Sequence, residues 1–147
     1  MKGIKMSDCR FYVDEVERVI VCVIPHTERM LREFIQDHFR WNDIDMDFAI
    51  GYHFESKLCM PNSFMGKAVC AEEDEWNEEL GKKIAFSRAK DKCYKSFFKR
   101  ANLLVQTLDR RLGDMIEAFN DFGLKLDAKR EALESQIESE TKKEGDA

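Results

Sequence analysis

Cysteine and histidine are the first residue types in this chain that could do chemistry. The chain has five cysteines, and no two of them form a Cys-x-x-Cys pair: Cys9, Cys22, Cys59, Cys70 and Cys93. A structural zinc site needs close cysteine pairs on tight turns, so we expect free thiols in a reducing compartment, with no metal and no other cofactor. His26, His38 and His53 are scattered, and their spacing does not pair any of them with Cys70 as base and nucleophile. His38 falls on the apolar side of a predicted helix, where a hydrogen-bonded core histidine is expected.

A run of carboxylates from Glu72 to Glu79 is the second candidate site. Divalent cations are held by carboxylates that converge from different turns or chains, whereas consecutive ones at a helix start fan outward. The run therefore indicates compensation of a helix dipole, with Asp74 as the cap; mimicry of phosphate against a basic cleft is an alternative. No glycine-rich phosphate loop, Gly-x-Ser-x-Gly or His-Glu-x-x-His motif occurs, so we expect a protein that is not an enzyme and has no catalytic residues.

Basic charge is concentrated between Lys82 and Arg111. This segment has ten basic and two acidic residues, so its net charge is +8. Because the whole chain has a net charge of −5, the remaining residues together carry −13. At 100° per residue, five of the basic side chains fall on one helix face, at about 220° to 280° from Lys82. This basic face could bind nucleic acid or an acidic protein, or it could be the solvated side of an amphipathic helix. Its members are Arg88, Lys92, Lys95, Lys99 and Arg110.

On the opposite side of the same helix, large apolar residues keep one phase from Tyr94 to Ile137, within about 40° to 140°. Such an apolar stripe favours self-association into a coiled coil or bundle, such as a homodimer, or docking of another protein. Gly113 and Gly123 are the weak points, each costing about 1 kcal/mol relative to alanine, and a helical hairpin that breaks near Gly123 is the alternative. The residues predicted to form the interface are Leu104, Leu108, Leu112, Met115, Phe119, Phe122 and Leu126.

The N-terminal half contains the elements that must support this helix. Short β-prone runs at 10–13 and 17–24 predict a hairpin. Three-and-four spacing of apolar residues over 28–39 predicts a helix, with Thr27 as its N-cap and Asn42-Asp43 at its end. Strict alternation over 46–54 predicts a half-buried strand.

A further short strand is predicted over 64–70. The sequence therefore predicts an α+β fold in which residues 1–71 form a small antiparallel sheet with one packed helix. Residues 72–137 form a long amphipathic helix or helical hairpin, and the polar segment 138–147 is a frayed tail.

The bulk composition excludes several classes of protein. The chain has 147 residues, of which 36% are charged, while Leu, Ile, Val and Phe make up about a quarter; this exceeds the roughly one-fifth below which a charged chain stays disordered. No apolar run is long enough to cross a bilayer as a helix, so no membrane span is expected. The start of the chain lacks the pattern of a secretory signal. We expect a cytoplasmic protein.

A strand-to-helix segment carries a recurring signature. It reads Gly66-Lys67-Ala68-Val69-Cys70, then Asp74-Glu75-Trp76, then Gly81-Lys82-Lys83-Ile84-Ala85 and Arg88-Ala89. The small residues Gly66, Gly81, Ala85 and Ala89 suit a helix pressed closely on a strand, and Trp76 would hold the helix start against the sheet. The segment resembles small, mostly uncharacterised accessory proteins of bacteriophages and prophages of Gram-positive bacteria.

This resemblance implies an accessory protein that works in the bacterial host cytoplasm by binding a host or phage protein. It is compatible with inhibition of a bacterial defence system, in the manner of an anti-CRISPR protein. The alternative function is nucleic-acid binding through the basic face between residues 82 and 111, aided by Phe97 or Phe98.

Overall fold

The computed structural model describes residues 3–51, 56 and 58–145. Two compact units, Met1–Thr107 and Leu108–Ala147, make up the chain, and the long C-terminal helix contributes to both. The units thus divide inside that helix, whereas the sequence placed its boundary at residue 71. The architecture is α+β, as the sequence predicts.

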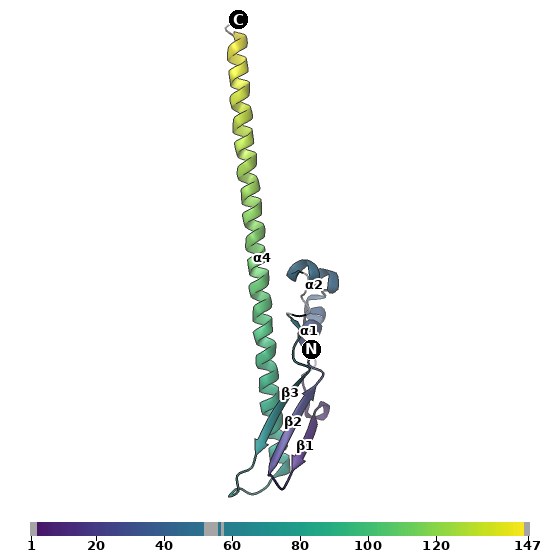
Figure 1. Ribbon diagram of the computed structural model, residues 1–147. Helices are drawn as coiled ribbons and strands as arrows, with labels where there is room; N and C mark the ends of the chain where they lie inside the picture. The colour runs from purple at the N-terminus through teal and green to yellow at the C-terminus, as the bar shows by residue number, and fades with distance from the viewer. Residues whose placement is uncertain (1–2, 52–55, 57, 146–147) are drawn as a thin grey trace. The chain divides into compact units, whose positions relative to one another are not determined.

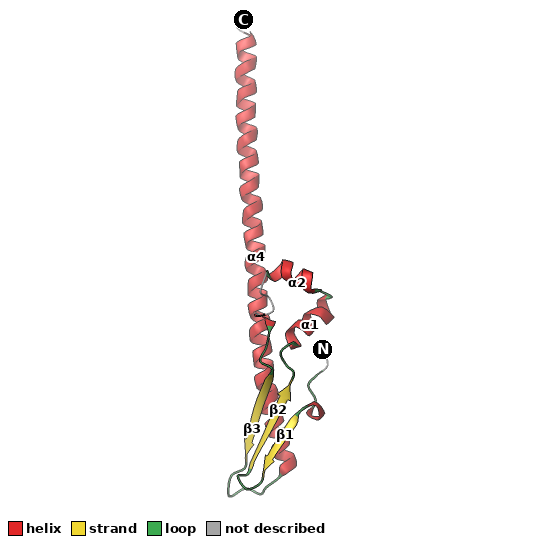
Figure 2. Ribbon diagram, turned by 45° about the vertical axis from the view of Figure 1, so that its right-hand side comes forward, coloured by secondary structure: helices red, strands yellow, loops and turns green. Residues whose placement is uncertain are grey.

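A three-stranded antiparallel sheet in the order β1-β2-β3 forms the base of the first unit (Figure 2). A short 3-10 turn at Met6–Asp8 precedes β1 (Arg10–Asp14), which forms a hairpin with β2 (Val19–Pro25), and β2 also pairs with β3 (Ser63–Val69). The predicted hairpin and the predicted third strand are both confirmed. Alternate residues of β2 are fully buried and the others half-buried, so β2 is the central strand and places Ile20, Cys22 and Ile24 in the core.

Helix α1 (Met30–Phe39) confirms the predicted first helix, but its predicted cap is wrong. Thr27 lies before the helix and its cap residue Arg29, and its hydroxyl donates a hydrogen bond to the carbonyl of Pro61. Its backbone N–H donates to the carbonyl of Asn62 over 3.1 Å. Thr27 is buried, and its two hydrogen bonds join the loop before α1 to the loop before β3. A partner so distant in the chain cannot be anticipated from the local cap pattern.

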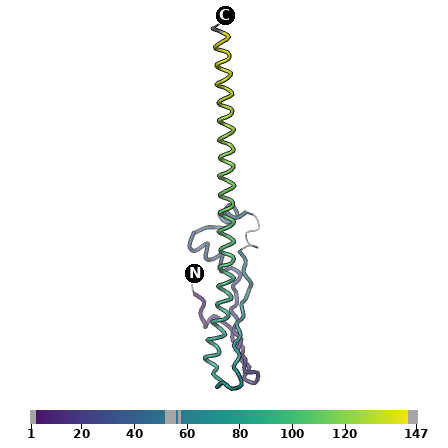
Figure 3. The backbone as a smooth tube through the Cα atoms, turned by 90° about the vertical axis from the view of Figure 1, so that its left-hand side faces the viewer, coloured from purple at the N-terminus to yellow at the C-terminus, as the bar shows by residue number. Residues whose placement is uncertain are grey.

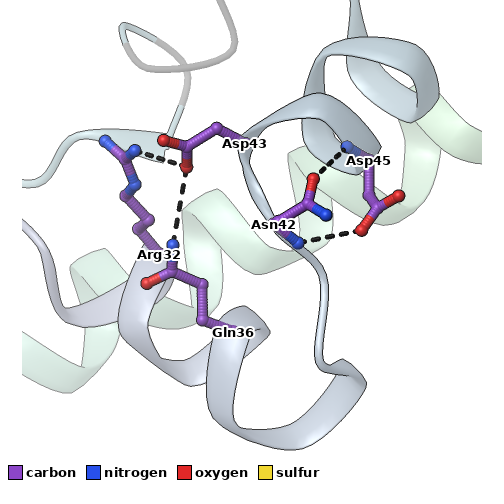
Figure 4. Close-up of polar contacts among 5 residues, drawn as sticks. All are labelled: Arg32, Gln36, Asn42, Asp43 and Asp45. Carbon is purple, nitrogen blue, oxygen red and sulfur yellow. Dashed lines mark hydrogen bonds and ion pairs between the residues drawn. The ribbon is translucent and has the colours of Figure 1, made fainter.

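Residues 43–50 form helix α2 (Asp43–Ile50), so the strand predicted over 46–54 is wrong there; residues 52–55 lie outside the described part of the chain. Met46 and Ile50 are buried whereas Phe48 is 85% exposed, so the period is that of a helix. A capping box begins α2 (Figure 4): Asn42 Oδ1 accepts from Asp45 N, and Asp45 Oδ2 accepts from Asn42 N. Asn42 thus begins the second helix, and α1 has already ended at Phe39.

Helix α4 (Glu78–Gly145) is a single helix that continues through Gly113 and Gly123, and Figure 3 shows it without a break. The hairpin alternative is therefore excluded, and the segment predicted to fray from Glu138 is helical to Gly145. Asn77 caps the helix, because its Oδ1 accepts from the N–H of Leu80 over 2.9 Å. The prediction of Asp74 as the cap is wrong, since Asp74 lies in the preceding turn.

The first turns of α4 lie along the sheet (Figure 1). A row of small residues at every fourth position faces it, and Ala85, Ala89 and Cys93 in this row are fully buried. The contact at Gly66 is so close that a Cβ there would lie 2.0 Å from the carbonyl oxygen of Ala85. This confirms that small residues let the helix press on the strand. Further along α4, Phe97 packs edge-on against Phe34 of α1, with ring centroids 5.5 Å apart.

Candidate interaction surfaces on α4

Two members of the basic face bind the edge strand of the sheet. Arg88 Nη1 donates to the carbonyl of Lys67 over 2.6 Å, and Lys92 Nζ donates to the carbonyl of Met65 over 2.9 Å. Because β3 is at the edge of the three-stranded sheet, its outer side pairs with no strand of the described residues, and charged donors suit the carbonyls of such an edge strand. Arg88 and Lys92 therefore hold α4 on β3.

The other members of the basic face are in solvent. Lys95 pairs with Asp91 one turn earlier over 2.8 Å, and both side chains are largely exposed. Lys99 is exposed, and beside it Phe98 is 66% exposed whereas Phe97 is buried. Arg110 is exposed and belongs to the second unit. An aromatic ring next to an exposed ammonium is the combination that could contact a nucleic acid.

The part of the apolar stripe that lies in the second unit is largely open to solvent. Met115 is 51% exposed and Phe119 is 70% exposed, and Leu112, Phe122 and Leu126 lie in the same range. Leu108 is half-buried, and so is Leu104, the one predicted interface residue in the first unit. Exposed apolar side chains of this size in a row are typical of an interaction surface.

The acidic run does not converge on one point. Glu78 pairs with Lys82 over 2.5 Å and Glu79 with Lys83 over 2.8 Å, and the hydrogen bond and charge of Lys83 lower the pKa of Glu79. Among the described residues, no three His, Cys, Asp or Glu side chains lie where they could hold one metal ion. The carboxylates at the helix start therefore act in pairs with lysines one turn later.

Arg18 is a structural anchor that sequence reasoning missed. It is the last residue of the β1–β2 turn and has a left-handed backbone (φ 52°). Its guanidinium donates to the Cys70 sulfur over 3.0 Å and to the carbonyls of Glu72 and Asp74. The hydrogen bond to Cys70 and the nearby charges of Asp74 and Glu72 raise the pKa of Arg18. Arg18 thus fixes the loop that leads from β3 into α4, and no local pattern signals a contact between segments so far apart in the chain.

A hollow of about 390 Å³ lies at this strand-to-helix junction. Its lining includes Ile20 and Ala68 from the sheet, Trp76 from the segment before α4, and Leu80 and Ile84 from the start of α4. Leu80 is 54% exposed, so these side chains cover the sheet incompletely. The signature segment therefore forms the structural junction between β3 and α4. Within it, Cys70, Glu72 and Asp74 contact Arg18.

The thiols and imidazoles form no nucleophile–base pair among the described residues. Burial raises the pKa of Cys22 to about 12, with Cys9 adding to the effect, and raises that of Cys93 to about 11. Burial also raises the pKa of Cys9, whose hydrogen bond with Cys22 opposes the shift.

The two described histidines, His26 and His38, are both exposed. His38 is exposed, so its predicted place on a buried face is wrong: its ring stacks on Phe34, and Nδ1 lies 3.0 Å from the carbonyl oxygen of Phe34. His26 is exposed in a loop, and His53 lies outside the described residues.

In the part of the chain that the structure describes, no helix has both the length and the apolar character needed to cross a membrane. The chain matches no protein-family model, and searches of curated proteins and of solved structures find no similar protein. Function must therefore be inferred from the surfaces of the chain itself.

Proposed function

We propose that this chain is a non-enzymatic interaction protein that self-associates through the apolar stripe of α4. One observation carries the proposal: the stripe residues Leu112, Met115, Phe119, Phe122 and Leu126 are each at least half exposed in the single chain. Covering such side chains contributes about 25 cal/mol per Å² of apolar surface removed from water. Packing this row against a similar row on a second helix removes the apolar side chains of both from water.

Light scattering of the full chain after size exclusion tests self-association. At concentrations on the order of 100 µM, the range in which weak helix pairing is populated, we expect a mass of at least twice 17.3 kDa. Leu112→Glu and Phe119→Glu place charge in the stripe and should reduce the mass to that of one chain. Leu124→Glu is the matched control, because Leu124 is 69% exposed but points to the opposite side of the helix. A wild-type chain that stays monomeric would contradict the proposal.

The biological partner that we propose is a host or phage protein in the bacterial cytoplasm, bound to block a defence system. This finer proposal is supported by the resemblance of the Gly66–Ala89 segment to phage accessory proteins. A bacterium with active CRISPR immunity provides the test: expression of the chain should raise plaque formation by a targeted phage. The Phe119→Glu variant should not raise plaque formation. If the chain changes plaque counts equally in cells without CRISPR immunity, the proposed inhibition of a defence system is contradicted.

Nucleic-acid binding is the second candidate function, and the exposed pair Phe98 and Lys99 favours it. Phosphate contacts make affinity fall steeply as salt rises. Fluorescence anisotropy with labelled single-stranded DNA should then detect binding at low salt, and Lys99→Glu should weaken it. Arg10→Glu, which changes an exposed charge on β1, is the control. Unchanged anisotropy at low salt would exclude this function.

A further inference from the structure

One row of large apolar residues in the second unit follows a strict alternation of four-residue and three-residue steps. The alternation begins at Leu108 and is kept without interruption to Leu126; its members are Leu108, Leu112, Met115, Phe119, Phe122 and Leu126. Steps of four and three average about 3.5 residues, the repeat of a left-handed coiled coil. The next two positions in the same pattern are Lys129 and Leu133. We call these eight residues the seam.

A seam of this kind fits another helix with the same repeat, because each side chain enters a hole between four residues of the facing helix. Leu133 continues the exposed row, at 59%. Lys129 can also lie in a seam, since its aliphatic stem packs along apolar surface while the ammonium reaches water. A second copy of this chain supplies such a helix without any further partner.

The residues that flank the seam distinguish parallel from antiparallel pairing. One flank carries Asp109, Ile116, Gly123 and Arg130, and the other carries Arg111, Ala118, Lys125 and Ala132. In a parallel pair, a residue of the second flank faces the residue of the first flank five positions later in the other copy. Lys125 would then face Arg130 of the second copy, a like-charge contact made twice, with no opposite-charge contact to offset it.

In an antiparallel pair, each flank faces itself. When Phe119 shares a layer with Phe122 of the second copy, Asp109 faces Arg130 of the second copy, and symmetry makes this opposite-charge contact twice. In the same register, Met115 meets Leu126 of the second copy and Ile116 lies beside Gly123, which has no side chain to obstruct it.

The neighbouring antiparallel registers are less favourable. Sliding one copy by one heptad in one direction places Arg111 opposite Lys125 of the second copy. Sliding it in the other direction places Lys125 opposite itself. Like charges that face each other across an interface disfavour that arrangement, so among these arrangements the Phe119–Phe122 register alone has an opposite-charge pair and no like-charge pair.

We infer that the segment 108–133 of α4 pairs antiparallel with the same segment of a second copy, with Phe119 against Phe122 and Asp109 against Arg130. This inference rests on the proposed self-association and adds its orientation and register. In the single chain Arg130 Nε lies 3.2 Å from Glu134, and both side chains are largely exposed. Such surface pairs are weak and exchange readily, so Arg130 is able to reach across to Asp109.

Charge-swap variants of the full chain test the orientation, with the dimer dissociation constant measured by sedimentation equilibrium. Asp109→Arg and Arg130→Glu should each weaken the dimer roughly tenfold, because both symmetric contacts change from attraction to repulsion. The double variant should return to within about threefold of wild type, since the pair is restored with its signs exchanged. Lys125→Glu is the matched control and should leave the constant unchanged, because it faces Ala118 in this register.

The parallel arrangement gives the opposite results. Arg130→Glu and Lys125→Glu would each tighten a parallel dimer, and the double swap would show no rescue; either finding overturns the inferred orientation while leaving self-association intact. A wild-type chain that never dimerises would instead refute self-association itself. Circular dichroism of each variant checks that α4 remains helical.

Cysteine cross-linking provides a second measurement of the register. A mixture of Leu112→Cys and Lys129→Cys chains, oxidised mildly, should yield a disulfide between positions 112 and 129, identified by mass spectrometry of the peptides. Position 112 should not link to itself in the Leu112→Cys chain alone, because an antiparallel pair separates the two copies of this position by about 25 Å along the helix. A dominant 112–112 link would overturn the register.

Discussion

Gly66 in β3 and Ala85 in α4 approach so closely that a Cβ on Gly66 would lie 2.0 Å from the Ala85 carbonyl oxygen and 2.4 Å from the backbone nitrogen of Ala89. Both of these contacts are to backbone atoms, which cannot rotate away as a side chain can. The helix and the edge strand are therefore in backbone contact, and this contact sets where α4 begins its path along the sheet.

We expect Gly66→Ala to destabilise the first unit by about 3 kcal/mol, because the helix backbone must move away from the strand. Urea unfolding followed by tryptophan fluorescence measures the change, since Trp76 lies next to this junction. Gly113→Ala is the control: a Cβ there has open space, and alanine should stabilise the helix by about 1 kcal/mol. Equal stability of Gly66→Ala and wild type would refute the close contact.

Removing the Asn42 side chain should destabilise α2. Asn42→Ala loses the hydrogen bond that Oδ1 accepts from Asp45 N over 3.0 Å, and loss of such a cap costs about 1 kcal/mol. Hydrogen exchange of the amides in 43–50 should accelerate. Asp47→Ala, at an exposed position of the same helix, should leave exchange nearly unchanged; if both variants exchange alike, the capping box is not formed.

The ammonium of Lys92 should contribute to stability where that of Lys99 does not. Lys92→Met leaves the edge carbonyl of Met65 without its donor, and we expect a loss of about 1 kcal/mol, the typical net value of a hydrogen bond from a charged group that is still partly hydrated. Lys99→Met removes an exposed charge and should change the unfolding free energy by less than about 0.5 kcal/mol. Equal effects would show that Lys92 is an ordinary surface residue.

Stability should decline at high pH because of two buried thiols, Cys93 and Cys22, and the part due to Cys93 can be separated. Burial raises the pKa of the Cys93 thiol from 9.0 to about 11, so between these values the folded chain keeps a proton that the unfolded chain has lost. The contribution is complete below pH 9 and disappears as pH rises towards 11, a loss of about 2 kcal/mol.

Denaturant unfolding at pH 8 to 11 measures this dependence. Cys93→Ala should make the decline shallower and leave the part due to Cys22. The smaller side chain also lowers stability at every pH, because it leaves a void beside Met30, whose sulfur lies 3.5 Å from that of Cys93. Cys59→Ala changes an exposed thiol and should keep the wild-type slope. A slope that is the same in all three chains would contradict the assignment to Cys93.

Arg18→Ala should loosen the loop from Cys70 to Asp74, because the side chain is the donor to the Cys70 sulfur and to two carbonyls of that loop. We expect faster hydrogen exchange at residues 70–77 with little change in 30–39. Arg10→Ala is the control on the neighbouring strand, and loop protection that survives in Arg18→Ala would show that Arg18 is not the anchor.

Periodicity was sufficient where one face of an element is buried over many residues. The alternation from Val19 to Ile24 predicted β2, and the phase of the stripe from Tyr94 onward predicted a long helix, with a break near Gly123 as the alternative. It failed over 46–50, because Met46 and Ile50 are four residues apart, a spacing that fits one face of either a strand or a helix, whereas Phe48 between them is exposed. The deciding signal was the Asn42–Asp45 capping box, which is visible in the sequence.

Sequence alone determined that a row of small residues, from Gly81 to Ala89, would let α4 lie close to a strand, since side-chain size is a local property. Only the tertiary structure decided which basic residues remain available for binding. Arg88 and Lys92 donate to carbonyls of β3, the edge strand of the folded sheet. A sequence lists charges on a helix face, but the acceptors that occupy them exist only after distant strands have paired.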